Sequence, residues 1–193
     1  MVNIPIQIVR VARPIHWVKN FALFAAIFLT GTLFEKGLSM DVIYAFISFS
    51  LATSATYIFN DIMDAKKDRL HPIKKSRPIA SGKLPIILAI FELISFVSLS
   101  LVIASSLNHL LFILIISYLI IQTLYSLGLK DIHVVDILII ATGFILRVYA
   151  GAFVINAHLS VWFLLCVVSA SLFLAAGKRR AEINLLEAVD GGT

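Results

Sequence analysis

Long apolar segments separated by short polar ones run through the whole sequence. Six of them lie at about 17–34, 42–60, 84–106, 109–128, 134–155 and 160–177. A helix needs about 20 apolar residues to cross the hydrocarbon core of a bilayer, and each segment reaches or approaches that length. The pattern therefore predicts an all-α fold, a polytopic transmembrane helix bundle. Because no polar linker or repeat interrupts it, we expect a single membrane domain over residues 1–193.

Composition and charge agree with this class. Hydrophobic residues make up 60% of the chain. With the N-terminus inside, the inner loops carry nearly all of the Lys and Arg, and the outer loops carry only Lys36. The positive-inside rule therefore predicts a cytoplasmic N-terminus. We expect no removable signal peptide, and the net charge of +5 calls for no nucleic acid partner.

An acidic cluster directly follows the second apolar segment. If the helix continues, Asp61, Asp64 and Asp68 lie at i, i+3 and i+7 on one face, with Asn60 four residues before Asp64. Such carboxylates repel one another unless a cation lies between them. Oxygen ligands suit Mg²⁺, which shares its coordination with substrate phosphates. The cluster predicts a Mg²⁺-dependent diphosphate site at a membrane surface. The alternative is a solvated helix end, balanced by neighbouring basic residues.

A basic segment comes next, in an inner loop that extends to residue 83. Pro72 and Pro78 end the helix, so that Lys74 and Arg77 can fold back over the carboxylates. Lys and Arg are the usual protein partners of phosphate. We therefore expect phosphate contacts from Lys74 and Arg77, whereas Lys83 fits a topological anchor.

Other polar residues interrupt the later apolar sequence. Arg147 lies about a dozen residues into the fifth segment, and an intramembrane charge is by default a functional site. It should face the bundle interior and meet a lipid phosphate or a carboxylate, Glu92 being the candidate for a structural ion pair. In the loop at 125–136, Lys130 is the single basic residue, and Tyr125 fits either a site residue or an interfacial aromatic.

These residues resemble the UbiA superfamily of intramembrane prenyltransferases, and more closely its decaprenyl-phosphate phosphoribosyltransferase branch. Asn60-Asp61-x-x-Asp64-x-x-x-Asp68 matches the first aspartate-rich motif of the superfamily. The closer resemblance rests on Arg13-Pro14-x-x-Trp17-x-Lys19-Asn20, on the run from His71 to Gly82, on Tyr125…Leu129-Lys130…Val135-Asp136, on Gly143-Phe144-x-Leu146-Arg147-x-x-Ala150-Gly151 and on Trp162-Phe163…Gly177-Lys178-Arg179. Two features depart from the pattern: His16 stands where glutamine is more frequent, and Asp131 and Asp136 lack the spacing found in prenyl-diphosphate enzymes.

The resemblance implies Mg²⁺-dependent transfer of 5-phosphoribose from phosphoribosyl diphosphate to a polyprenyl (decaprenyl) phosphate, with release of pyrophosphate. It implies a bundle of about nine helices, of which the six segments would be the N-terminal two thirds. The implied site has Asp61, Asp64 and Lys130 as catalytic residues, Asn60, Asp64 and Asp68 as metal ligands, and Lys19, Tyr57, Lys74, Arg77, Tyr125 and Arg147 as substrate-binding residues.

Two alternatives stay open at this point. One is prenyl transfer from a prenyl diphosphate to another acceptor with the same metal chemistry. The other is an inactive membrane fragment, scaffold or partner subunit. A transporter is less well supported, because no paired Gly/Pro-broken helices are present. In either case we expect an integral protein of a prokaryotic cell (inner) membrane, with a cytoplasmic active face and a homo-oligomer as one possibility.

Overall fold

The structure, a computed structural model, describes residues 3–35 and 37–190. Lys36 lies outside this range, as do the side chains of Asp131, His133, Lys178, Arg179 and residues 182–190. The regular elements in the described ranges are all helical, which confirms the predicted all-α class. They are α1 (Ile4–Ala12), η1 (Pro14–Phe24), α2 (Ala25–Leu29), α3 (Leu38–Leu70), η2 (Lys74–Ser76), α4 (Ile86–Leu107), α5 (His109–Leu127), η3 (Leu129–Asp131), α6 (His133–Val154) and α7 (Val161–Asp190).

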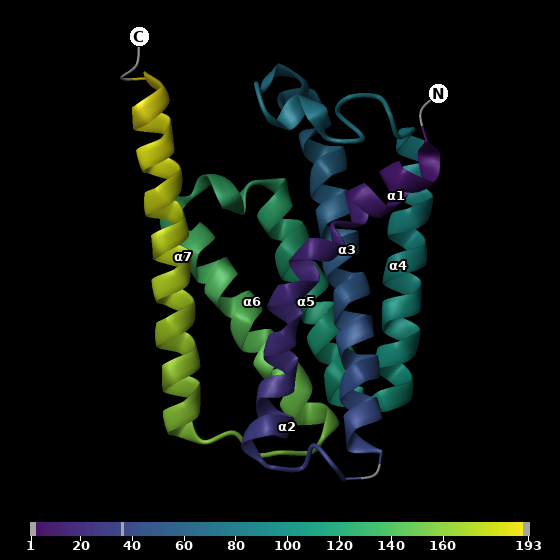
Figure 1. Cartoon of the computed structure of the whole chain (residues 1–193), viewed down its shortest axis with the longest axis vertical. Helices are drawn as coiled ribbons and strands as arrows, with labels where there is room; N and C mark the ends of the chain where they lie inside the picture. The colour runs from purple at the N-terminus through teal and green to yellow at the C-terminus, as the bar shows by residue number, and fades with distance from the viewer. Residues whose placement is uncertain (1–2, 36, 191–193) are drawn as a thin grey trace.

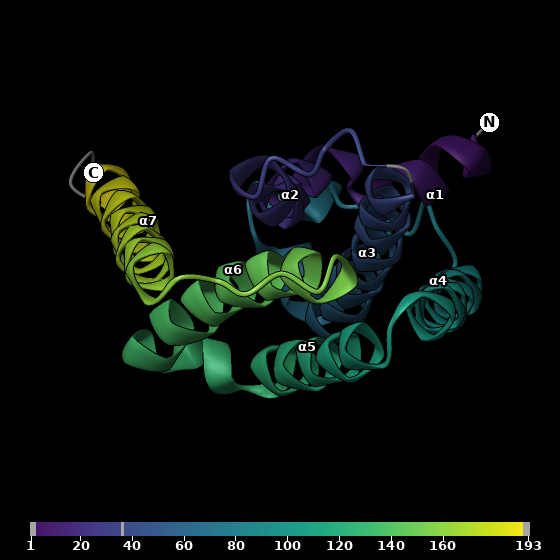
Figure 2. The same cartoon turned by 90° about the horizontal axis from the view of Figure 1, so that it is seen from below.

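Four helices in the described part of the chain are long and apolar enough to cross a membrane: α3, α4, α5 and α6. The apolar part of α7 is shorter and covers Val161–Gly177. The protein is therefore an integral membrane protein. Figure 1 shows α3 in the middle of the bundle and α7 at one flank, where it packs on α6. Seen from below, α4, α5 and α6 follow one another around α3 (Figure 2).

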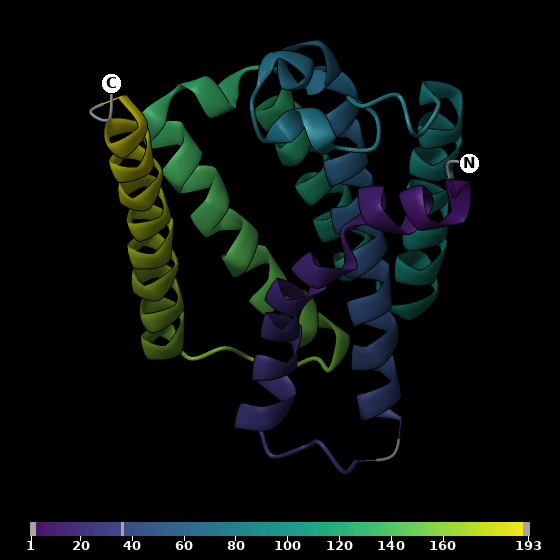
Figure 3. The ribbon, with the colours of Figure 1, turned by 45° about the horizontal axis from the view of Figure 1, so that its top comes forward.

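The first apolar segment does not form the single long helix that the hydropathy predicted. An additional short helix, α1, precedes it and ends at Arg13, whose backbone is left-handed at φ 52° and ψ 57°. Pro14 then opens a 3-10 helix that turns into α2 only at Ala25. Proline lacks a backbone N–H and restricts the residue before it, so that α1 cannot run on into η1. As a result α1 crosses α3 and α4 at one end of the bundle (Figure 3).

The second segment behaves as predicted, because α3 continues through the acidic cluster to Leu70. It ends where His71 takes an extended conformation before Pro72. Small buried residues on α3 let its neighbours approach closely, as in other membrane helices. Ser48 and Ser100 tie α3 to α4, since each hydroxyl donates to the backbone carbonyl of the other, at 2.8 and 2.7 Å. The acidic cluster is carried by α3, whose apolar part is the most buried of the four candidate membrane spans.

Candidate active site

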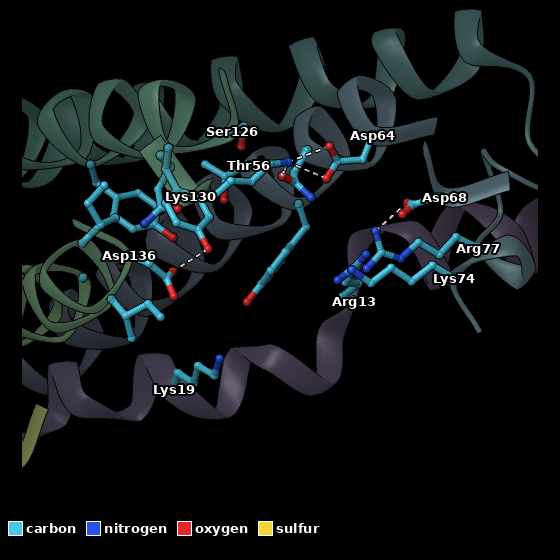
Figure 4. Close-up of a pocket in the computed structure, with 18 of the residues that line it drawn as sticks. Arg13, Lys19, Thr56, Asp64, Asp68, Lys74, Arg77, Ser126, Lys130 and Asp136 are labelled. Carbon is cyan, nitrogen blue, oxygen red and sulfur yellow. Dashed lines mark hydrogen bonds and ion pairs between the residues drawn. The ribbon is translucent and has the colours of Figure 1, made fainter. Parts of the chain in front are cut away.

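A cavity of about 660 Å³ opens between α3, α5, α6, η1 and the loop after α3 (Figure 4). Its described lining includes seven basic side chains and three carboxylates, so that the walls favour an anionic occupant. Ten of the predicted site residues lie on it: Lys19, Tyr57, Asn60, Asp64, Asp68, Lys74, Arg77, Tyr125, Lys130 and Arg147. Asp61 is not among the lining residues. The cavity therefore joins segments that are more than 100 residues apart in the sequence.

The oxygen-bearing side chains of α3 that line the cavity lie four residues apart in the sequence. Asn60, Asp64 and Asp68 share one helix face and line the cavity together with Thr56. The sequence prediction placed Asp61 on this face as well. Asp61 is only about 20° of helix rotation from Asp68, but Arg13 and Arg77 cover its carboxylate, and it is not among the residues that line the cavity. The exposed fraction of Asp61 is 2%.

Asp61 ties two basic residues to α3. Its Oδ1 accepts hydrogen bonds from Arg13 Nη2 at 2.5 Å and from Arg77 Nη1 at 3.2 Å. Arg77 Nη1 also donates to Asp68 Oδ2 at 2.6 Å. The guanidinium of Arg13 lies 5.0 Å from the centroid of the Tyr57 ring. These contacts fix the N-terminal segment and the loop after α3 at the mouth of the cavity, which is a positioning role for Asp61; its predicted catalytic role stays a prediction.

Lys130 pairs with the acidic face at Asp64, away from the arginines that hold Asp61 and Asp68. It comes from η3, the short turn between α5 and α6, and its Nζ donates to both carboxylate oxygens of Asp64, at 2.6 and 2.7 Å. The Oδ1 of Asn60 is a third acceptor at 3.4 Å. Nearby, the hydroxyl of Tyr125 donates to Asp136 at 2.8 Å, which links the end of α5 to the start of α6. Figure 4 shows both interactions.

Arg147 lies deeper in the bundle and is 6% exposed. Its Nε donates to Asn20 Oδ1 at 2.7 Å, and Asn20 in turn donates to Ser50 at 2.9 Å. The guanidinium also lies 5.3 Å from the Phe49 ring and 5.5 Å from the Tyr118 ring. No carboxylate pairs with Arg147 among the described residues, so its positive charge remains available to an anion in the cavity.

The alternative pairing of Arg147 with Glu92 is wrong. Both carboxylate oxygens of Glu92 are buried without a hydrogen-bond partner in the part of the chain that the structure describes. The reason is geometric, because Arg147 points from α6 to η1 and α5, whereas Glu92 belongs to α4 on the far side of α3. Hydropathy alone could not distinguish the two sides of the bundle.

Some lining residues were missed by the sequence analysis. Thr56, Tyr118 and Gln122 lie in apolar segments, on the cavity side of α3 and α5. Their signal was present in the sequence, since a polar side chain inside a membrane span is expensive and tends to face the bundle interior. Gln122 in particular directly follows the apolar run Leu119-Ile120-Ile121 and could have been selected on that ground.

The donor chemistry of the acidic face fits Mg²⁺. The described His, Cys, Asp and Glu residues form no group of three that is close enough to hold a metal ion. Two carboxylates of this face have basic partners instead: Lys130 donates to Asp64, and Arg77 donates to Asp68. Side-chain oxygens of Asn60 and Asp64 already surround one cation, the ammonium of Lys130. Such oxygens are the ligands that magnesium prefers.

A comparison with protein families matches residues 20–179 to the UbiA prenyltransferase family. The chain belongs to this family.

Its similar relatives include three proteins named decaprenyl-phosphate phosphoribosyltransferase. The one from Mycolicibacterium smegmatis is 39% identical over 96% of this chain, and those from Corynebacterium glutamicum and Mycobacterium tuberculosis are 38% identical over the same share. The chain spans 59%, 57% and 63% of the lengths of these relatives.

Solved structures of UbiA homologues have the same fold. A homologue from Archaeoglobus fulgidus, solved with DMAPP and Mg²⁺, superposes with a TM-score of 0.73 at 25% identity. That match covers 88% of this chain and 60% of the homologue. A digeranylgeranylglyceryl phosphate synthase gives a TM-score of 0.65 at 19% identity, which bears on the fold alone.

Proposed function

We propose that the protein takes part in transferring 5-phosphoribose from phosphoribosyl diphosphate to a polyprenyl phosphate, with release of pyrophosphate. The observation that carries the proposal is a cavity in which an oxygen-rich face of α3 meets separate groups of cations. A reaction between two phosphorylated substrates requires such separate anion sites. The names of the relatives at 38–39% identity supply the substrates.

The donor would bind at the mouth of the cavity. Lys74 and Arg77 come from the loop after α3, and Lys19 lines the same cavity from η1. Arg77 presents a planar fork that suits phosphate oxygens, and Asp61 and Asp68 already orient it. Tyr57 is placed beside this group by its contacts with Arg13 and His16. Together these residues would hold the diphosphate and the ribose 5-phosphate.

The lipid phosphate would bind deeper, at Arg147. Its guanidinium has no described carboxylate partner and lies within the apolar part of the bundle, where a polyprenyl chain is soluble. The phosphate nucleophile is already ionised at neutral pH, so that little general-base assistance is needed. Catalysis would then come mainly from positioning the attacking oxygen against C1 of the ribose and from stabilising the departing charge.

Magnesium fits the donor end of this arrangement. When bound by Asn60 and Asp64, with Asp68 nearby, Mg²⁺ would neutralise charge on the diphosphate leaving group. Lys130 lies beside these oxygens and would supply a second positive charge to the leaving group.

Isotope transfer from separately labelled donors tests the proposal. Membranes that contain the protein would receive either ribose-labelled phosphoribosyl diphosphate or a labelled prenyl diphosphate, each with polyprenyl phosphate and Mg²⁺. We expect label from the ribose donor in the lipid fraction. Label entering lipid from the prenyl donor alone would reject the proposal in favour of prenyl transfer. Membranes without the protein are the control.

Prenyl transfer is the second candidate, favoured by the likeness to a homologue solved with DMAPP and Mg²⁺. A third candidate is an inactive scaffold or partner subunit, since the chain spans about three fifths of its relatives. The chain can be fused to the C-terminal region of a relative that it does not match, to distinguish an inactive scaffold from an enzyme that needs this region. If only the fusion protein is active, the cavity needs further helices. Cytoplasmic orientation and a homo-oligomer stay predictions.

A further inference from the structure

Lys130 occupies the oxygens that a magnesium ion would need. Its Nζ lies 2.6 and 2.7 Å from the carboxylate oxygens of Asp64 and 3.4 Å from Asn60 Oδ1. A lysine ammonium has three N–H donors, so these three acceptors satisfy it completely. In this arrangement Lys130 has no donor left for a substrate phosphate.

We propose that Lys130 is an exchangeable internal cation of the site. It holds the Asn60 and Asp64 oxygens while no divalent cation is bound, and it moves to a phosphate oxygen when a metal ion takes its place. This inference rests on the magnesium role in the proposed function. It does not depend on whether the donor carries ribose or an isoprenoid.

The two occupants exclude each other for electrostatic and steric reasons. Magnesium binds oxygen at about 2.0–2.1 Å and would use the same carboxylate of Asp64. An ammonium and a divalent cation within about 4 Å repel each other strongly in a partly buried site. Lys130 and Asp64 are each 19% exposed. The ammonium therefore has to leave Asp64 when the metal binds.

The surroundings of Lys130 allow such a movement. The residue lies in a single 3-10 turn between Gly128 and Ile132, on the rim of the cavity. The lysine side chain is a flexible four-carbon stem, so that its ammonium can travel several ångströms while the backbone stays in place. The cavity of about 660 Å³ lies directly beside it.

The exchange couples metal binding to diphosphate binding. A metal ion alone has to displace Lys130, and a diphosphate alone finds Lys130 already engaged. When both bind, the metal neutralises Asp64 and Lys130 gains a phosphate partner. Each ligand therefore strengthens the binding of the other, which is positive thermodynamic coupling. The site would in this way resist filling by free metal.

Mn²⁺ binding, measured by electron paramagnetic resonance on the purified full chain without any substrate, tests the first half of the proposal. We expect Lys130→Gln to bind Mn²⁺ about 10-fold more tightly than the wild-type protein. The matched control is Lys67→Gln, which removes an equal charge from the same cavity lining and should stay within about 3-fold of wild type. Addition of inorganic diphosphate should cancel or invert the advantage of Lys130→Gln.

Equal or weaker Mn²⁺ binding by Lys130→Gln would overturn the proposal, as would equal tightening by Lys67→Gln, because that would be a general effect of charge. The unaltered protein provides a second readout. Mn²⁺ alone should increase the acetylation of Lys130 by an amine reagent, measured by mass spectrometry, because the ammonium is released from Asp64. Unchanged labelling at saturating Mn²⁺ would contradict the exchange. Neither readout requires turnover, so a failure of the transferase assay is distinguishable from a failure here.

Discussion

Two buried carboxylates of this protein have opposite surroundings. Asp61 is 2% exposed and accepts from two arginines, whereas Glu92 is 7% exposed and has no described partner for either oxygen. Burying a charge is costly unless hydrogen bonds and opposite charge compensate it. The two residues should therefore respond to substitution in opposite directions.

Asp61→Asn is expected to destabilise the protein by about 1–3 kcal/mol, because it leaves Arg13 and Arg77 without their shared carboxylate. The loop that carries Arg77 would loosen, so that the KM for the donor should rise more than kcat falls. Thermal unfolding in detergent and steady-state kinetics measure the two effects. Asp41→Asn, at the other end of α3, is the control and should change both little. An Asp61→Asn protein that keeps its stability but loses kcat would instead support a catalytic role.

Glu92→Met is expected to stabilise the protein by about 1–3 kcal/mol, since it removes a buried carboxylate without a described partner and keeps an apolar volume. The midpoint of thermal unfolding in the same detergent should rise, with no change in donor KM because Glu92 does not line the cavity. A lower midpoint would mean that Glu92 meets a partner outside the described contacts.

At the level of elements, the site depends on close contact between η1 and α6. A Cβ atom on Gly151 would lie 1.8 Å from the backbone oxygen of Leu23, so that only glycine fits at this crossing. The same crossing brings Asn20 to Arg147 and places Lys19 across from the acidic face. A change at this one position should therefore disturb both sides of the cavity.

Gly151→Ala is expected to cost about 1–3 kcal/mol of stability through overpacking and to weaken substrate binding. Gly177→Ala is the matched control, since no described atom lies within 4 Å of the added methyl group. That variant should stay within about 1 kcal/mol of wild type. Thermal unfolding and donor binding of the two variants give the comparison. Equal behaviour of the two alanine variants would show that η1 and α6 separate without consequence.

The elements also show what hydropathy can predict. The apolar segments at 84–106, 109–128 and 134–155 coincide closely with α4, α5 and α6. Long apolar runs leave few alternatives to a membrane helix. The segment at 17–34 was predicted less well, because hydropathy does not show that the chain there forms the 3-10 helix η1 from Pro14 and then a short α-helix that ends at Leu29. The face of α3 that carries Asn60, Asp64 and Asp68 was predictable from helical periodicity. The side-chain orientation of Asp61 required the positions of α1 and the following loop.

For the whole molecule, the sequence predicted which residues gather but not how they pair. Ten of the predicted residues line one cavity, although they come from η1, α3, α5, α6 and two loops. The pairs Lys130 with Asp64 and Arg147 with Asn20 join residues 66 and 127 positions apart. Pairing at such separations follows from how helices are arranged around α3, which no local pattern encodes.

Pyrophosphate release tests the proposed transfer, measured in membranes that contain this chain and receive phosphoribosyl diphosphate, Mg²⁺ and polyprenyl phosphate. We expect release only when all three are present, and a decrease of about 100-fold or more in Asp64→Asn at equal membrane insertion. Release without the lipid phosphate, full activity of Asp64→Asn, or no release by correctly inserted wild-type protein would contradict a Mg²⁺-dependent transfer of phosphoribose at this site.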